Sequence, residues 1–214
     1  MKNNIFFIII ITLLFFIKNA HSEQYEFETS DIKIVDGGNI VYATNGKAIS
    51  IKNNLEIQAQ KFEYFREKEL LIAFNGTAIL KLENLKIEFN EIKIDQKKFL
   101  ITAKNKVKII DVDKKMTFES ENIKFDQQSK ILTSQTDSIL TDKFKNNFLT
   151  KSFEYNLNDN ILKITKAKFS DYKKNKFEID LAYINTVSNK LLGKDVTLNL
   201  NNESFNKDNE PRLK

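Results

Sequence analysis

The sequence predicts an all-β protein, an antiparallel meander of about a dozen short strands. Three observations predict this class. Apolar and polar residues alternate with period two, similar segments return about every thirty residues, and short polar clusters separate the segments. Parallel strands would need crossover connections of a dozen or more residues, and the connections here are too short for them.

The repeat is visible in two octapeptides, ATNGKAIS at 43–50 and AFNGTAIL at 73–80, whose glycines are thirty residues apart. A third copy begins thirty residues further on, at Ala103. Two columns of apolar residues keep this interval, so about six units are expected between Asp31 and Leu200. The first column contains Val41, Leu71, Ile101, Ile131, Ile161 and Leu191, and the second contains Ile49, Ile79, Ile109, Ile139 and Phe169.

A third, looser column consists of paired apolar residues that open each unit. It slips by one residue between its second and third pairs, and we expect such a slip to lie in a loop, where insertions are tolerated. The pairs are Phe62 with Tyr64, Ile92 with Ile94, Ile123 with Phe125, and Phe153 with Tyr155.

Each unit is expected to contain about two strands joined by hairpin turns. Segments such as 55–59, 85–89 and 177–181 alternate apolar and polar residues, and Ile, Phe, Thr and Tyr are frequent in the repeat. A sheet of such strands must hide one face, so two layers are expected to face each other. The expected turns are the polar clusters at 36–39, 66–68, 95–97, 126–129 and 156–160.

The Asn-Gly pairs of the first two copies allow two readings, a tight hairpin turn or a bend within a strand. Asn105 and Lys106 occupy the corresponding place in the third copy. Because lysine does not suit the tight turn, the bend is favoured, and the glycine is predicted to be dispensable.

The first 22 residues are expected to form a secretory signal peptide. Lys2 precedes a run of thirteen residues, 5–17, that is apolar except for Thr12, and small residues follow at Ala20 and Ser22. A membrane anchor is the rival reading, but thirteen helical residues reach only about 20 Å of the roughly 30 Å hydrocarbon core. We therefore expect an exported chain with a β domain at 23–200 and a polar tail at 201–214.

The residue inventory excludes several classes of site. Cysteine is absent and the only histidine is His21, so we expect no catalytic triad, no Cys nucleophile, no metal, no cofactor and no enzyme activity. The charges are nearly balanced and interspersed, which argues against nucleic acid as a partner. Acidic pairs such as Asp111 with Asp113, and Glu119 with Glu121, are expected on the solvated side of a strand.

Over roughly residues 25–200 the chain resembles a known family. Thirty-residue β units follow an export signal and carry the pattern Phe62-x-Tyr64, Leu71-x-Ala73, Gly76 and Ile79, with Leu70 before Leu71. This pattern is similar to the OstA-like periplasmic domain of lipopolysaccharide transport proteins, and most of all to the N-terminal domain of the LptD family.

The resemblance implies a folded-over β-jelly roll whose apolar interior holds the acyl chains of lipopolysaccharide. It implies that edge strands join partner Lpt jelly rolls end to end, by strand addition. It also implies a periplasmic location, associated with the outer membrane of a Gram-negative bacterium.

The resemblance further implies that apolar residues of the repeat line this groove, although most residues of such columns are expected to be plain core. The lining candidates are Phe62, Tyr64, Leu71, Ile79, Ile92, Ile94, Ile101, Ile109, Ile123, Phe125, Ile131, Ile139, Phe153, Tyr155, Ile161 and Phe169.

Two questions stay open at the level of sequence. A structural or adhesive β-repeat protein of the cell surface, without a lipid ligand, is the alternative function. Within the family, the chain is either a fragment of an LptD protein, with Pro211 to Leu213 leading toward a missing barrel, or a free-standing carrier similar to LptA.

Overall fold

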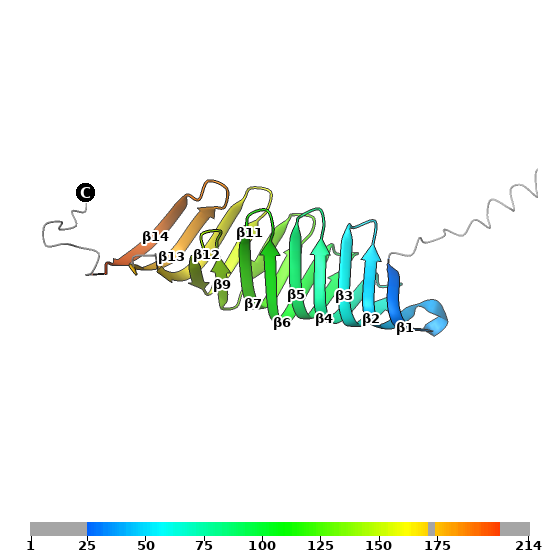
Figure 1. The fold of residues 1–214 in the computed structure, drawn as a ribbon. Helices are drawn as coiled ribbons and strands as arrows, with labels where there is room; N and C mark the ends of the chain where they lie inside the picture. Colours follow the sequence, from blue (N-terminus) through cyan, green and yellow to red (C-terminus); the bar gives the residue numbers. More distant parts are fainter. Residues whose placement is uncertain (1–24, 171–173, 202–214) are drawn as a thin grey trace, which may run out of the picture.

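In the computed structural model, which describes residues 25–170 and 174–201, the chain forms one antiparallel β-sheet of fourteen strands, folded over on itself (Figure 1). The described part contains no α-helix and one short 3-10 turn, η1 (Asp36–Gly38). The predicted antiparallel, jelly-roll-like class is therefore confirmed. The predicted signal peptide at 1–22, and all of the predicted tail except Asn201, lie outside the described residues.

Most strands have nine to twelve residues, because each one continues through the fold from one layer to the other. Two crossings are interrupted at the fold, so β8 and β9 together make one, and β10 and β11 make the next. The strands are β1 (Glu26–Val35), β2 (Ile40–Ser50), β3 (Leu55–Phe65), β4 (Leu70–Leu80), β5 (Leu85–Asp95), β6 (Leu100–Asp111), β7 (Met116–Asp126), β8 (Ile131–Ser134), β9 (Ser138–Thr141), β10 (Asn147–Thr150), β11 (Ser152–Asn156), β12 (Ile161–Ser170), β13 (Lys176–Asn185) and β14 (Leu191–Asn199).

The strands are arranged nearly in sequence order along the length of the molecule (Figure 1). Among the described strands, β1 pairs only with β2 and lies at one end, whereas β14 pairs only with β13 and lies at the other. The chain is thus an extended meander whose two edge strands are separated by the whole sheet.

The thirty-residue repeat is one round trip of the chain across the sheet. Strands β3 and β4 have eleven residues each, and each is followed by a four-residue turn, which makes thirty residues. The turns therefore alternate between two rims of the folded sheet, which we call lips. Among the fully described turns, the first lip consists of turns 36–39, 66–69, 96–99, 127–130, 157–160 and 186–190, and the second lip of turns 51–54, 81–84, 112–115 and 142–146.

Neighbouring turns of one lip are hydrogen-bonded to each other. On the first lip the backbone N–H of Gln96 donates to the carbonyl of Glu69 over 3.0 Å, and on the second lip that of Lys81 donates to Asn54 over 2.9 Å. Each acceptor is the last residue of its turn and has a positive φ, 51° at Glu69 and 49° at Asn54. The turn geometry thus aims a carbonyl at the next turn and satisfies a backbone donor there.

The Asn-Gly pairs lie at bends inside β2 and β4. Asn45 and Asn75 have φ values of 49° and 52°, a left-handed conformation that asparagine tolerates better than most residues. A Cβ atom on Gly46 or Gly76 would lie 2.1 Å from a carbonyl oxygen of the neighbouring strand, and both glycines pair with Ala59. Asparagine provides the bend and glycine the close approach, so the prediction that the glycine is dispensable is wrong.

Strand β6 makes the same bend with one extra residue. Asn105 and Lys106 both have positive φ values, 62° and 67°, and the pairing register shifts at this point. Val107 then takes the place that corresponds to Gly76, and its side chain is buried. This bulge contains the one-residue slip of the repeat, which was expected in a loop, because a bulge admits a residue without breaking the ladder on either side.

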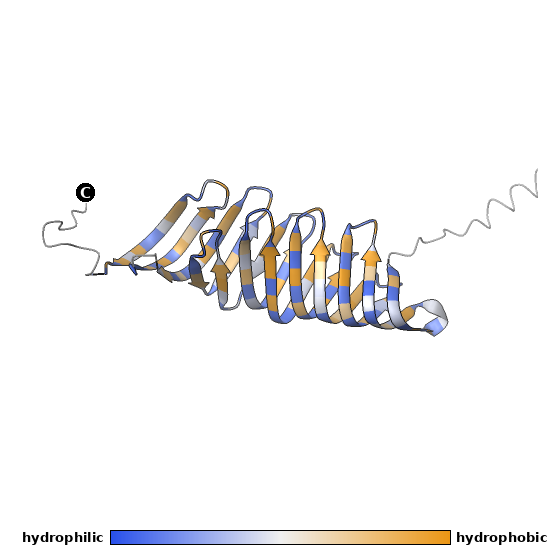
Figure 2. Ribbon diagram, in the orientation of Figure 1, coloured by the Kyte–Doolittle hydropathy of each residue, from blue (hydrophilic) through white to orange (hydrophobic). Residues whose placement is uncertain are grey.

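The apolar core lies between the two layers of the folded sheet, and apolar and polar bands alternate along the strands (Figure 2). The inward positions change phase at the bend. In β4 the buried residues are Leu71 and Ala73 before the bend, but Ala78 and Leu80 after it. Ile79, between the last two, consequently points outward and is 40% exposed.

The residues of the second apolar column therefore do not all lie on the same face of the sheet. Ile109 is buried because the extra residue of β6 shifts the phase, whereas Ile139 is 41% exposed and Ile49 is half-buried. The expectation that Ile79 and Ile139 line the interior is corrected, since a constant sequence interval passes through bends of different length.

Candidate functional site

The structure places most of the proposed lining residues in a closed core. Five of the sixteen candidates are not buried: Ile131, Ile161 and Phe169 are half-buried, and Ile79 and Ile139 are exposed. The buried ones, each exposed by 4% or less, are Phe62, Tyr64, Leu71, Ile92, Ile94, Ile101, Ile109, Ile123, Phe125, Phe153 and Tyr155.

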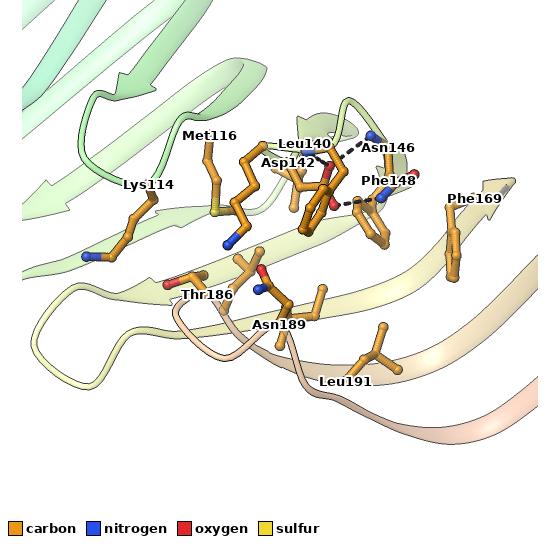
Figure 3. Close-up of a pocket in the computed structure, with 14 residues that line it drawn as sticks. Lys114, Met116, Leu140, Asp142, Asn146, Phe148, Phe169, Thr186, Asn189 and Leu191 are labelled. Atoms are coloured by element: carbon orange, nitrogen blue, oxygen red, sulfur yellow. Dashed lines mark hydrogen bonds between the residues drawn. The ribbon is translucent and has the colours of Figure 1, made fainter. Parts of the chain in front are cut away.

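An apolar cavity of about 200 Å³ opens near the C-terminal end of the interior (Figure 3). Its walls come from strands that are distant in sequence: Met116 from β7, Leu140 from β9, Phe148 from β10 and Ile184 from β13. Of the proposed lining residues, only Phe169 is part of this cavity.

The β9–β10 turn forms the wall of the cavity at the second lip. One carboxylate oxygen of Asp142 accepts the backbone N–H groups of Phe144 and Asn146, both over 2.8 Å, and the other accepts the Asn146 amide over 2.8 Å. Phe144 is exposed, and the ammonium of Lys143 lies 5.1 Å from the centre of its ring. A hydrogen-bonded turn thus holds an apolar ring at the cavity entrance.

A row of aromatic rings continues from the cavity toward the end of the sheet. The ring centres of Phe148 and Phe169 are 4.8 Å apart, and Phe169 stacks on Phe177 at 4.4 Å. Leu198 of the edge strand β14 pairs with Phe177 and is exposed. The inner apolar surface therefore extends from the cavity to the C-terminal edge.

The interior is open at both ends of the sheet. Val196 of β14 pairs with buried Ile179, and Ile34 of β1 pairs with buried Val41, yet Val196 and Ile34 are each about half exposed. Directly paired residues share a face, so these exposed side chains belong to the inner face. Each end thus presents inner apolar surface beside the unpaired edge of a strand.

No protein-family model matches this chain, and a search of curated proteins finds no match. Among residues 25–170 and 174–201, no group of three or more His, Cys, Asp or Glu side chains could hold a metal ion. In the same part of the chain, no helix has the length and apolar character needed to cross a membrane.

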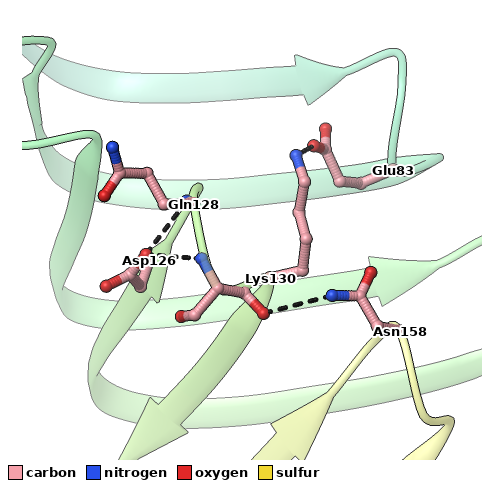
Figure 4. Close-up of polar contacts among 6 residues, drawn as sticks. Glu83, Asp126, Gln128, Lys130 and Asn158 are labelled. Atoms are coloured by element: carbon pink, nitrogen blue, oxygen red, sulfur yellow. Dashed lines mark hydrogen bonds and ion pairs between the residues drawn. The ribbon is translucent and has the colours of Figure 1, made fainter.

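The mouth of the fold, between the two lips, is bridged by polar contacts. Lys130 of the first lip forms an ion pair with Glu83 of the second lip (Figure 4). In the same cleft, the hydroxyl of Tyr155 donates to Oδ2 of Asp111 over 3.1 Å. Asp111 is buried, and its Oδ1 accepts the backbone N–H of Lys114 over 2.9 Å. The prediction of a solvated Asp111 is therefore wrong, because Asp111 continues the inward-facing positions of Val107 and Ile109 at the end of β6.

Burial raises the pKa of the Tyr155 phenol well above its ordinary value, and the nearby charge of Asp111 acts in the same direction. The ring of Tyr155 stacks on Phe118 with centres 5.5 Å apart. The phenol therefore stays protonated and keeps its hydrogen bond to the carboxylate.

Sequence reasoning missed most cavity residues. Met116, Leu140 and Phe148 fall outside the three repeat columns, and they meet where the strands on either side of the β9–β10 turn are interrupted. In the sequence, the polar segment 135–137 interrupts the alternation of apolar and polar residues between Ser134 and Ser138. This interruption is the sequence feature that could have indicated the cavity.

Proposed function

We propose that this chain binds lipid acyl chains in its folded apolar interior, as a module of lipopolysaccharide transport and outer-membrane assembly that performs no catalysis. The observation that carries the proposal is an apolar interior with a cavity and two open ends. The geometry supports an acyl ligand, and the choice of lipopolysaccharide comes from the resemblance to OstA-like domains.

Burial of an acyl chain explains why such an interior is useful. A chain of about twelve carbons costs roughly 10 kcal/mol to expose to water, at about 0.8 kcal/mol per methylene. The cavity of about 200 Å³ is smaller than common ligand pockets of about 300–1,000 Å³. It therefore suits the end of a chain, and the rings of Phe169 and Phe177 offer the path along which the rest would lie.

The proposal includes docking of partner jelly rolls at β1 and β14. A partner strand added to either edge would pair its free backbone groups. It would also cover the inner side chains that now contact solvent, Ile32 and Ile34 at one end and Val196 and Leu198 at the other. A periplasmic location, associated with the outer membrane, is part of the same proposal and follows from the N-terminal sequence and the resemblance.

Site-specific photo-crosslinking in cells tests the lipid ligand. A crosslinking amino acid at Phe169, in the cavity wall, should capture lipopolysaccharide, because the acyl chain would contact this ring. The matched control is Ile79, which belongs to the same repeat column but points outward. Absence of lipid at Phe169, or equal capture at both positions, contradicts the proposal.

The exposed apolar edges also suit a second function, a structural or adhesive β-repeat protein of the cell surface. Assembly through the edges alone would give protein-to-protein crosslinks from β1 and β14 and no lipid at Phe169. The same set of crosslinks therefore distinguishes the two functions.

A further inference from the structure

We propose that the second lip is a membrane-binding surface that docks on anionic lipid bilayers. The four of its turns that are fully described follow one another along one rim of the sheet, and each presents an apolar side chain to solvent. Isolated exposed apolar residues are common, but a row with one in every turn is not expected by chance. The four side chains, each between 57% and 72% exposed, are Ile51, Leu82, Val112 and Phe144.

The charge of the second lip complements an anionic surface. Each of these four described turns contains lysine, and their three carboxylates are occupied within the protein. Glu83 forms an ion pair with Lys130, and Asp113 accepts a hydrogen bond from the side-chain amide of Asn84 over 3.1 Å. Asp142 accepts a hydrogen bond from the backbone N–H of Phe144 in its own turn. The lysines are Lys52, Lys81, Lys114, Lys115, Lys143 and Lys145.

The spacing favours a bilayer over a protein partner. Consecutive turns of one lip are two strands apart, about 10 Å, so the row spans about 30 Å. Single apolar side chains at this interval, with lysines between them, do not form the contiguous apolar patch of a protein interface. A fluid bilayer can accept each side chain separately while the lysines contact headgroups.

The first lip provides an internal comparison. Its turns at 36–39, 66–69 and 127–130 contain no apolar residue, and the turn at 66–69 has both signs of charge. Phe99 and Val187 are exposed on this lip, but the turns 127–130 and 157–160 lie between them, and neither residue has an exposed apolar side chain in a neighbouring turn. The two lips thus have the same backbone construction and different surfaces.

Membrane docking stands independently of the proposed lipid cargo. Because the mouth of the interior lies between the lips, a docked second lip would hold that mouth against the bilayer. Vesicle binding and capture of lipid at Phe169 are separate measurements, so either can fail alone.

The absence of cysteine from the sequence allows a direct test in the full chain. Leu82→Cys carries an environment-sensitive fluorophore on the second lip, and Val187→Cys carries it on the first. With vesicles of phosphatidylglycerol and phosphatidylcholine, emission from position 82 should shift to the blue and be quenched by brominated lipids, and emission from position 187 should not. Both chains have the same N-terminal apolar segment, so insertion of that segment alone would affect the two labels alike.

A second experiment tests whether the lysines of the second lip are needed for membrane binding. Lys52→Glu with Lys143→Glu, in the Leu82→Cys chain, should abolish the blue shift, whereas Lys68→Glu with Lys98→Glu on the first lip should preserve it. Vesicles of phosphatidylcholine alone should give no shift. An equal response at positions 82 and 187, an equal response to neutral vesicles, or a shift that survives the charge reversal on the second lip would overturn the proposal.

Discussion

The hydroxyl of Tyr155 donates a hydrogen bond to the buried carboxylate of Asp111, 3.1 Å away, across the mouth of the folded sheet. Tyr155 lies in β11, just before a turn of the first lip, and Asp111 is the last residue of β6, beneath the second lip. The two residues therefore join layers that no strand pairing connects at this point. This contact gives the mouth a specific closed position.

Tyr155→Phe should lower the free energy of unfolding by about 1–3 kcal/mol, because the buried carboxylate of Asp111 loses a donor. Urea denaturation measures the change. Tyr183→Phe, at an exposed tyrosine of β13, is the matched control and should change stability by less than about 0.5 kcal/mol. Equal effects of the two substitutions would contradict the role of the hydrogen bond.

Stability should fall more steeply with alkaline pH in the native chain than in Tyr155→Phe. Burial raises the pKa of Tyr155 in the folded state, while an unfolded tyrosine titrates near pH 10. The stabilisation is complete below that value and is lost as the pH rises toward the folded pKa, because the unfolded state binds fewer protons there. Denaturation midpoints between about pH 9 and 11 measure the difference, and parallel curves would refute it.

Gly76→Ala should destabilise the protein by about 3 kcal/mol or more, because the added Cβ would lie 2.1 Å from the carbonyl oxygen of Gln58. Lys106→Gly, in the bulge of β6, should instead be neutral or stabilising by up to about 1 kcal/mol, since it relieves a positive φ. Chemical denaturation of both variants checks the pair. Tolerance of alanine at position 76 would show that the neighbouring strand can move away.

Ile109→Ala should cost about 2–5 kcal/mol of stability, whereas Ile79→Ala should cost less than about 1 kcal/mol. The two residues occupy the same column of the repeat, but Ile109 is buried and Ile79 points outward. Thermal or urea unfolding measures the difference. Similar losses would mean that the phase change at the bend of β4 does not exist in solution.

The Glu83–Lys130 ion pair should stabilise the closed mouth. In a double-mutant cycle with Glu83→Gln and Lys130→Met, the coupling free energy should be about 1–2 kcal/mol, since the carboxylate is largely buried. Each single variant should also bind more of an apolar fluorescent probe, because the lips separate more readily. Additive stabilities together with unchanged probe binding would exclude this bridging role.

Sequence patterns predicted the class and repeat of this fold, but not the side on which every repeated residue lies. Val41 and Leu71 were assigned to an interior face, and both are buried. Ile79 was misplaced because the phase of alternation depends on how each strand bends, which the thirty-residue interval does not reveal. The polar clusters predicted as turns all lie on the first lip, whose turn at 186–190 was not predicted. The turns of the second lip were not predicted, and each of them contains an apolar residue, such as Ile51 and Leu82, that makes it less polar than a typical turn.

The candidate site was less predictable than the fold. The residues proposed from the repeat were mostly those that fill the core, because strict periodicity selects positions that every unit needs for packing. Leu140 and Phe148 line the cavity at the place where the repeat is interrupted. Departures from the repeat marked the cavity better than the repeat itself.

The ladder of hydrogen bonds from turn to turn has a consequence for the size of the molecule. Among the described residues, the backbone hydrogen bonds between turns join each thirty-residue unit to the units before and after it. Adding or removing one unit would therefore change the length of the sheet by two strand spacings, about 10 Å, and leave its cross-section unchanged. The number of repeat units therefore sets the length of the sheet, and with it the distance between the edge strands β1 and β14.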